Sequence, residues 1–347
     1  MAFFKFEGLR VAGIATCVPE HVEPTISTST AYNREAYMAT TGILEKRWSN
    51  DFTASDLCQA ATERLLDSLG WERDSIDVLI FVSQTPDYIL PATSCVLHGK
   101  LGLKKACLCQ DISLGCSGWV YGMTTILSLL QSGTSLRRAL LLTGDARKSA
   151  YEEPDQLFGY AGTATAVEYD PEKSDYPIFI ELGTDGTGYD AIIRPGGGTR
   201  NPINEDTFKL VECEDGRKRH SLQTRMKGLD VFAFGITTAP KSIKNLAKEA
   251  GFEYNDFDYF VFHQANRKMN ETIRAKLKLP EEKVPYSMTY FGNTSSASIP
   301  LTITTQLGDK LPGEKAKIIG CGFGVGLSWG TIAFEADHIV IPPLTEL

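Results

Sequence analysis

Cysteine, histidine and long apolar runs are scarce in this chain of 347 residues. Its eight cysteines are too few for a disulfide scaffold at this length, and no two of them form a CxxC pair, so we expect no structural zinc site. No stretch reaches about 18 apolar residues without a charge, and the first residues lack the pattern of a secretory signal. We therefore expect a reduced, cytoplasmic protein that does not cross a membrane.

Basic residues are outnumbered, 35 against 43 acidic ones, which gives a net charge of −8. Binding to nucleic acid or to an anionic membrane requires a basic surface, so this balance argues against both functions. A hydrophobic content of 42% is ample for a buried core. Any acidic partner would have to bind a local basic patch.

An internal repeat divides the chain into two related α/β halves. Residues 57–85 and 238–266 each read as an amphipathic helix, a glycine stop, a polar loop and a buried strand, and they align without a gap at an offset of 181 residues. We therefore predict halves at 1–180 and 181–347. The identical pairs are Leu65/Leu246, Gly70/Gly251, Glu72/Glu253, Asp77/Asp258 and Phe81/Phe262.

Further strands and helices alternate in each half, which is typical of layered α/β proteins. The glycine-rich, polar stretch 190–225 is predicted to be an excursion of the chain, that is, a long surface loop over one face, where binding loops often lie. Helices are predicted from near Pro91, at 119–133, at 266–279 and at 302–311. Strands are predicted at 106–113, 138–145, 315–324 and 327–336.

Cys116 is the first candidate for chemistry. It lies between Gly115 and Gly118, where a buried strand passes into an apolar helix. The N–H groups and the positive dipole end of a helix N-terminus favour a thiolate, and flanking glycines allow close approach of a substrate carbonyl. A buried structural cysteine is the alternative and the commoner role of a free thiol, but the position at a strand end between glycines favours a nucleophile here more than at the other seven cysteines.

His263 and Asn293 are the second and third candidates. His263 ends a buried strand, and the carboxyl ends of strands are where α/β proteins place ligands. Asn293 lies in a turn rich in glycine and hydroxyl residues, where it could equally serve as a cap. The glycine run 320–326 would let a backbone N–H point into a site, as an oxyanion hole requires.

Together these segments resemble the thiolase superfamily, and within it the 3-oxoacyl-(acyl-carrier-protein) synthase III type, over nearly the whole chain. The resemblance implies a five-layered αβαβα fold built from two duplicated halves, and a homodimer. The segments that carry it are TGILEKR (41–47), GCSGW (115–119), HQAN (263–266), GNTSSASIP (292–300) and GFGVGLSWG (322–330).

The resemblance also implies the chemistry. Cys116 would accept an acyl group from a thioester, with the amides of Cys116 and Val325 holding the oxyanion. His263 and Asn293 would then stabilise the enolate formed when a malonyl thioester loses CO2. Neither a metal nor a redox cofactor is required.

Four positions depart from the family pattern. The adenine-binding Trp and Arg of members that use acyl-CoA are matched by Ala36 and Thr40, and the position of a further family Arg falls in the acidic stretch 151–156, which contains no Arg. A Phe that lines the partner's acyl pocket is matched by the smaller Leu90. We therefore predict a donor longer or bulkier than acetyl, bound as CoA in another way or carried by a carrier protein, with Trp119 and Phe158 as further pocket residues.

An acyl carrier protein, the partner that the resemblance implies, is acidic and needs a cationic docking surface. Arg267, Arg274 and Lys278 follow one another at seven and four residues, which would place them on one helix face. Lys268 matches a carrier-docking Arg of the family. An ordinary solvated helix face is the alternative.

Two further functions remain open at this point. One is an acyltransferase of the same family that makes esters or amides without forming a carbon–carbon bond. The other is a non-catalytic subunit of a heteromeric condensing complex. The presence of Cys116, His263 and Asn293 together favours decarboxylative condensation over both.

Overall fold

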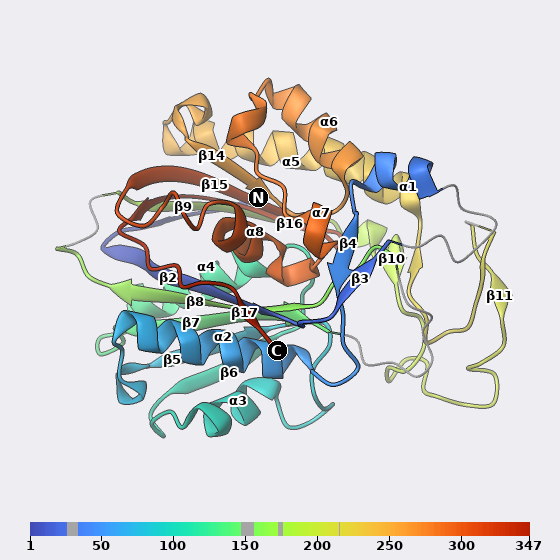
Figure 1. Cartoon of the computed structure of the whole chain (residues 1–347), viewed down its shortest axis with the longest axis horizontal. Helices are drawn as coiled ribbons and strands as arrows, with labels where there is room; N and C mark the ends of the chain where they lie inside the picture. Colours follow the sequence, from blue (N-terminus) through green and yellow to red (C-terminus); the bar gives the residue numbers. More distant parts are fainter. Residues whose placement is uncertain (26–33, 147–155, 173–175, 215) are drawn as a thin grey trace.

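The computed structural model describes residues 1–25, 34–146, 156–172, 176–214 and 216–347. Two mixed β-sheets lie face to face, with helices between them and on both outer faces (Figure 1). The first sheet has six strands, with β7, β5 and β6 parallel and β8 antiparallel to both of its neighbours. In spatial order they are β17 (Thr345–Glu346), β2 (Leu9–Val18), β8 (Ala161–Tyr169), β7 (Arg138–Asp145), β5 (Val78–Val82) and β6 (Leu108–Ile112).

The second sheet has five strands and is antiparallel except for its last pair, β15 and β14. Its central strands β16 and β15 are almost wholly buried, so both faces of this sheet are covered. In spatial order the strands are β1 (Ala2–Phe6), β9 (Ile178–Thr184), β16 (Ser328–Asp337), β15 (Lys315–Gly324) and β14 (Tyr259–Phe262).

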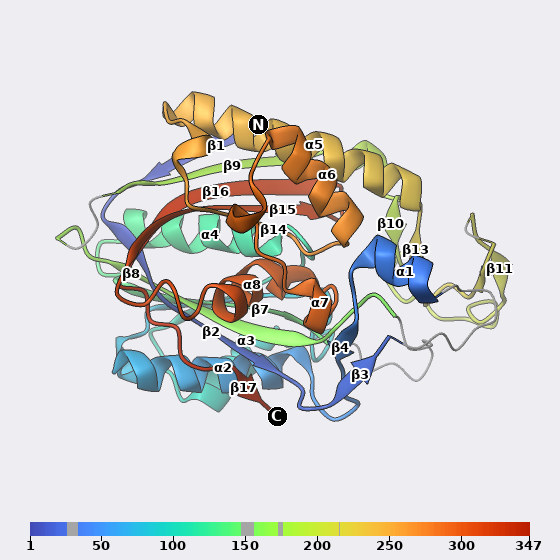
Figure 2. The ribbon, with the colours of Figure 1, turned by 45° about the horizontal axis from the view of Figure 1, so that its top comes forward.

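Helices complete three more layers, so the predicted five-layered αβαβα fold is confirmed. Helices α4 (Gly118–Ser132) and α8 (Ser298–Gln306) lie between the sheets and contact strands of both. The six-stranded sheet is covered by α2 (Ala54–Leu69) and α3 (Thr93–Leu101). The five-stranded sheet is covered by α5 (Gly228–Ala250) and α6 (Arg267–Leu277) (Figure 2).

The sequence repeat corresponds to two copies of one helix–turn–strand unit. In the first copy, α2 ends at Gly70, a 3₁₀ turn follows at Arg73–Ser75, and β5 begins. In the second, α5 ends at Gly251, the turn lies at Tyr254–Asp256, and β14 begins. Both glycines have left-handed backbone angles, with φ of 63° and 74°, which explains why the helix stop is glycine in each copy.

The two sheets do not divide cleanly at the predicted halves. The boundary at 180/181 falls inside β9, which begins at Ile178. Strand β1 pairs with β9 in the second sheet, while β17 at the other end of the chain pairs with β2 in the first. Each terminal strand therefore extends the sheet formed mainly by the opposite half, a pairing that local sequence patterns do not reveal.

The smaller elements lie at one side of the layers. Helix α8 begins earlier than the predicted helix, because Pro300 fits in a first turn where its missing N–H costs nothing. The predicted excursion forms two short ribbons that project beside α1 (Figure 2). These elements are α1 (Arg34–Thr41), α7 (Met288–Phe291), β3 (Val22–Pro24), β4 (Glu45–Arg47), β10 (Ile192–Ile193), β11 (Val211–Glu212), β12 (Lys218–Arg219) and β13 (Arg225–Met226).

The described residues contain neither a membrane-spanning helix nor a metal-binding cluster. None of their helices is long and apolar enough to cross a membrane. Within those residues, no group of three or more His, Cys, Asp or Glu side chains is placed to hold a metal ion.

Candidate active site

Cys116 lies in a tight turn between β6 and the N-terminus of α4. It is 9% exposed, and the Gly118 amide donates to the Gly115 carbonyl at 2.7 Å to close the turn. A Cβ on Gly115 would come within 2.5 Å of Gln84 Oε1, and one on Gly118 within 2.6 Å of Val82 Cγ1. Gly118 is therefore required for packing against Val82, whereas at Gly115 the flexible end of Gln84 could shift to admit a side chain.

The glycine run at the end of β15 packs directly against Cys116. A Cβ on Gly324 would lie 2.7 Å from Cys116 Cβ and 3.0 Å from its Sγ. Gly322 is equally constrained, because its Cβ would lie 2.7 Å from the Cys116 carbonyl oxygen. Val325 follows Gly324 in the turn to β16, and its carbonyl accepts a hydrogen bond from Ser328 Oγ at 2.7 Å. Val325 is thus next in the chain to the residue that contacts Cys116, while its oxyanion role stays a prediction.

His263 follows β14, the parallel neighbour of β15, and its side chain is buried. The ring packs edge-on against Phe323, with the two ring centroids 5.7 Å apart. Phe323 immediately precedes Gly324, so one short piece of β15 contacts both His263 and Cys116. The His263 amide donates to the Cys321 carbonyl at 2.8 Å, which fixes the backbone of the histidine to the same strand.

The imidazole of His263 is held in its neutral form. Burial lowers its pKa from 6.5 to about 3, and a hydrogen bond with the backbone of Ser295 offsets part of this effect. Ring nitrogen Nδ1 lies 2.8 Å from Ser298 Oγ. With the Ser298 hydroxyl as donor, Nδ1 accepts and Nε2 carries the ring proton, so a neutral ring can donate a hydrogen bond.

We expect acid to destabilise the fold through His263. Between the ordinary pKa of 6.5 and the folded value of about 3, the unfolded chain binds a proton that the folded chain does not. Above about pH 6.5 this group therefore does not change the free energy of unfolding. As the pH falls below that value, the free energy of unfolding decreases by up to about 1.4 kcal/mol per pH unit. Denaturant unfolding of the wild type and of His263→Gln at about pH 7 and about pH 4.5 measures this. Equal acid sensitivity of the two proteins would contradict it.

Asn293 lies in the turn after α7, with 5% of its surface exposed. Its amide donates to the Leu157 carbonyl at 2.8 Å, and its carbonyl accepts from Gly159 at 3.1 Å. Side-chain Oδ1 accepts from the Ser295 amide at 2.9 Å. Both main-chain and side-chain bonds therefore hold this residue in place.

Shared neighbours bring Cys116, His263 and Asn293 to one place. The Phe323–Gly324 pair contacts the histidine and the cysteine. Ser295 is bonded to Asn293 and to His263, and its Oγ would lie 3.4 Å from a Cβ on Gly115, the residue before Cys116. The three predicted catalytic residues therefore lie close together, connected by these shared neighbours.

The three predicted acyl-pocket residues lie in different environments. Trp119 is wholly buried, and its indole N–H donates to Thr165 Oγ1 at 3.0 Å in the packed core. Phe158 is half-buried and forms a backbone bridge with Asn293, next to the site. Leu90 is 80% exposed, at the end of an apolar loop that includes Tyr88 and Ile89. Packing thus accounts for Trp119, and the pocket roles of all three stay predictions.

The positions that depart from acyl-CoA-using members are only partly described. Ala36 and Thr40 are exposed one turn apart on α1, where Thr40 Oγ1 donates to the Ala36 carbonyl at 2.9 Å. Of the acidic stretch 151–156, residues 151–155 lie outside the described residues. The described positions offer neither an aromatic ring nor a guanidinium to an adenine.

The predicted docking cations do not form one open face. Arg274 donates to Glu271 at 2.7 Å and to the Leu279 carbonyl at 2.8 Å, and Arg267 lies over the Tyr286 ring, 4.8 Å from its centroid. Lys278 follows the end of α6 in a left-handed conformation, with φ of 56°, so helical spacing does not apply to it.

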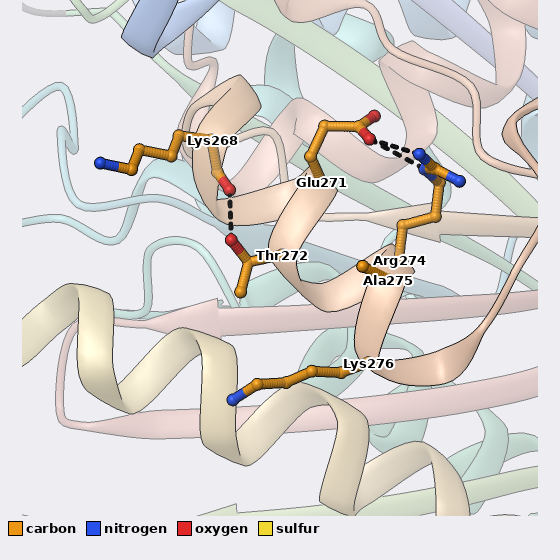
Figure 3. Close-up of a pocket in the computed structure, with 6 residues that line it drawn as sticks. All are labelled: Lys268, Glu271, Thr272, Arg274, Ala275 and Lys276. Atoms are coloured by element: carbon orange, nitrogen blue, oxygen red, sulfur yellow. Dashed lines mark hydrogen bonds and ion pairs between the residues drawn. The ribbon is translucent and has the colours of Figure 1, made fainter.

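Sequence spacing missed Lys276, which lies eight residues after the exposed Lys268 on α6 and donates from Nζ to the Ile236 carbonyl of α5 at 2.9 Å. Figure 3 shows Lys268 and Lys276 on α6 with Arg274 directed elsewhere, toward Glu271. The residues drawn line a hollow of about 630 Å³. A second hollow of about 470 Å³ lies between α6 and α5, where Lys276 meets Lys241 and Lys244. Contacts between the two helices create this surface, so no pattern within α6 alone could predict it.

Comparison with known proteins agrees with this architecture. Two family models match: 3-oxoacyl-(acyl-carrier-protein) synthase III at residues 110–186, and the C-terminal part of the same synthase at residues 247–336. A β-ketoacyl-(acyl-carrier-protein) synthase III of Fusobacterium nucleatum is 31% identical over 337 residues, covering 94% of this chain and 98% of the relative. A synthase III of the same name from Geobacillus kaustophilus is 31% identical over 340 residues, covering 94% of this chain and 99% of the relative.

Solved structures of related synthases have the same fold over nearly the whole length of this chain. The crystal structure of a 3-oxoacyl-(acyl-carrier protein) synthase from Burkholderia xenovorans is 36% identical, with a TM-score of 0.91 and coverage of 100% of this chain and 99% of the other. The synthase III of Pseudomonas aeruginosa is 25% identical, with a TM-score of 0.83 and coverage of 97% and 100%. The chain therefore belongs to the 3-oxoacyl-(acyl-carrier-protein) synthase III family of the thiolase superfamily and is a condensing enzyme of the acyltransferase class.

Proposed function

We propose that this protein condenses an acyl group with a malonyl thioester in two half-reactions. In the first, the Cys116 thiolate attacks the carbonyl of an acyl thioester, the acyl–Cys116 thioester forms, and the carrier thiol leaves. In the second, a malonyl thioester loses CO2, and the resulting enolate attacks the acyl carbonyl. The Cys116 thiolate is expelled, and a 3-oxoacyl thioester is released.

The observation that carries this proposal is the convergence of Cys116 with a neutral, buried His263 and with Asn293. Decarboxylation puts negative charge on the thioester oxygen, and His263 Nε2 and Asn293 Nδ2 are the hydrogen-bond donors proposed for it. A neutral imidazole with its other nitrogen bonded to Ser298 suits this role. The amides of Cys116 and Val325 are the donors proposed for the acyl oxyanion. The scheme requires no metal or redox cofactor.

The malonyl thioester is proposed to arrive on acyl carrier protein, in fatty acid or specialised metabolite biosynthesis in the cytoplasm. The proposed docking surface consists of Lys268 and Lys276 on α6 together with Lys241 and Lys244, which line the second hollow on α5; Lys276 keeps its charge while it donates to the Ile236 carbonyl. Arg267, Arg274 and Lys278 would add to its positive potential. Because α6 begins four residues after His263, a carrier bound there would lie next to the site.

We also propose a homodimer in which the exposed loop at Tyr88–Leu90 enters the partner's acyl site. An apolar tip that is 97% exposed at Ile89 and 80% at Leu90 is costly in water and is expected to be covered. The smaller Leu90 would leave room for an acyl donor longer or bulkier than acetyl.

Reversing the charge of the docking pair should weaken the use of the carrier. Lys268→Glu together with Lys276→Glu is expected to raise KM for malonyl-carrier about 10-fold, with less effect as salt is added, because exposed charges are screened. Arg64→Glu on α2, in the opposite outer layer, changes charge in the same direction and serves as the control. Equal effects of the two sites would contradict docking at α6.

The function is tested by incubating the protein with a panel of acyl-CoA and acyl-carrier thioesters and measuring its intact mass. We expect an acyl adduct on Cys116 that malonyl-carrier discharges with release of CO2. Discharge only by alcohols or amines would replace condensation by ester or amide formation. No adduct with any donor would contradict both activities.

A further inference from the structure

A buried carboxylate that the proposed mechanism does not use lies beside the site. Asp145 is the last residue of β7 and is 8% exposed. Its Oδ1 accepts from the Ser83 hydroxyl at 3.2 Å, the Gln84 amide at 2.8 Å and the Thr85 hydroxyl at 3.3 Å. No salt bridge to it occurs in the described part of the chain, so hydrogen-bond donors satisfy this oxygen.

The second oxygen of the same carboxylate binds the turn that carries Asn293. Asp145 Oδ2 accepts from Ser296 Oγ at 3.0 Å and from the Ser296 amide at 3.4 Å. Ser296 lies 151 residues further along the chain, three positions after Asn293. The carboxylate therefore connects the loop after β5, on the side of Cys116, to the turn on the side of His263 and Asn293.

This turn needs to be held in place. Ser295 has a φ of 51°, a left-handed conformation that is uncommon for a residue with a side chain. The same turn contacts His263 twice, through the backbone of Ser295 and through Ser298 Oγ. A change in its conformation would therefore move Asn293 and alter the hydrogen bond that sets the proton position on His263.

We propose that Asp145 is a positioning residue for the decarboxylation half-reaction. Through its two bonds to Ser296, it holds the turn so that Asn293 and His263 can face the malonyl thioester carbonyl together. Hydrogen bonds to a carboxylate are stronger than those between neutral groups, and small displacements of catalytic groups are costly in rate. The inference rests on the proposed two half-reactions.

Two single-hydroxyl variants test the role without removing the carboxylate. Ser296→Ala deletes a donor to Oδ2 and is expected to slow the release of CO2 from malonyl-carrier about 10-fold, with acylation of Cys116 unchanged. Ser83→Ala deletes a donor to Oδ1 of the same carboxylate, away from the turn, and is expected to leave CO2 release unchanged. Equal effects of the two variants on CO2 release would overturn the proposal.

Asp145→Asn should have a larger effect than either serine variant. Donors face both oxygens of the carboxylate, so the NH2 group of asparagine meets donors in either orientation of the amide. CO2 release is expected to fall about 100-fold, and the rate of acyl adduct formation by less than about 3-fold. Equal losses in both half-reactions, or CO2 release by Asp145→Asn at the wild-type rate, would overturn the role of Asp145.

Wild-type protein is measured in the same assays as the reference. If it releases no CO2, the proposed condensation is what fails. The pair Ser296→Ala and Ser83→Ala decides the question if Asp145→Asn unfolds.

Discussion

Cys116→Ala should form no acyl adduct with any donor, and its condensation rate should fall by at least about 10³-fold. Only the thiolate supplies the covalent intermediate, and Gly322 and Gly324, which pack against Cys116, have no side chain that could take its place. Alanine is smaller than cysteine, so the fold should persist. Intact mass after incubation with acyl thioester measures the adduct, and product analysis measures condensation.

The same variant separates the two half-reactions. His263 and Asn293 remain, so Cys116→Ala should still release CO2 from malonyl-carrier without making a 3-oxoacyl product. Cys95→Ala is the matched control, because Cys95 is an exposed thiol on α3 that would report non-specific acylation. An adduct that survives in Cys116→Ala and disappears in Cys95→Ala would place the nucleophile elsewhere.

His263→Ala should show the opposite pattern. The acyl adduct on Cys116 should form at near the wild-type rate, while CO2 release from malonyl-carrier falls about 10²–10³-fold, as when an oxyanion donor is removed. The physical reason is that the neutral ring donates to a charge that exists only after decarboxylation begins. Trapping the adduct by mass and following CO2 release in one series of samples measures both steps.

His263→Gln refines this test. Glutamine keeps a hydrogen-bond donor in a buried site and should recover part of the CO2 release lost in His263→Ala. If acylation falls as far as CO2 release in both variants, His263 instead acts on the cysteine, and its assignment to the second half-reaction is wrong.

The layered fold was largely predictable because its signals are local. Buried strands and amphipathic helices have periodic apolar residues, and the stops at Gly70 and Gly251 follow from the left-handed angle that only glycine adopts easily. The exchange of β1 and β17 between the sheets was not predictable. Strand pairing between distant segments depends on how the whole chain packs, and no local pattern encodes it.

The docking cations show the same limit at a surface. Spacing along α6 suggested that Arg267, Arg274 and Lys278 act together, but it could not show that Glu271 binds Arg274 or that Lys278 lies beyond the helix. Conversely, Lys276 becomes part of a groove only because α5 packs beside α6.

By itself, the sequence determined the family, the αβαβα class and the candidates Cys116, His263 and Asn293, because these depend on residue type, order and short-range spacing. Tertiary structure alone decided how the three meet: β15 touches both Cys116 and His263, and the turn from Asn293 to Ser298 closes on the same point. It alone revealed Asp145 as the link between the two sides. The reason is physical: burial, pKa shifts and hydrogen bonds across 151 residues arise only when distant segments exclude water from one another.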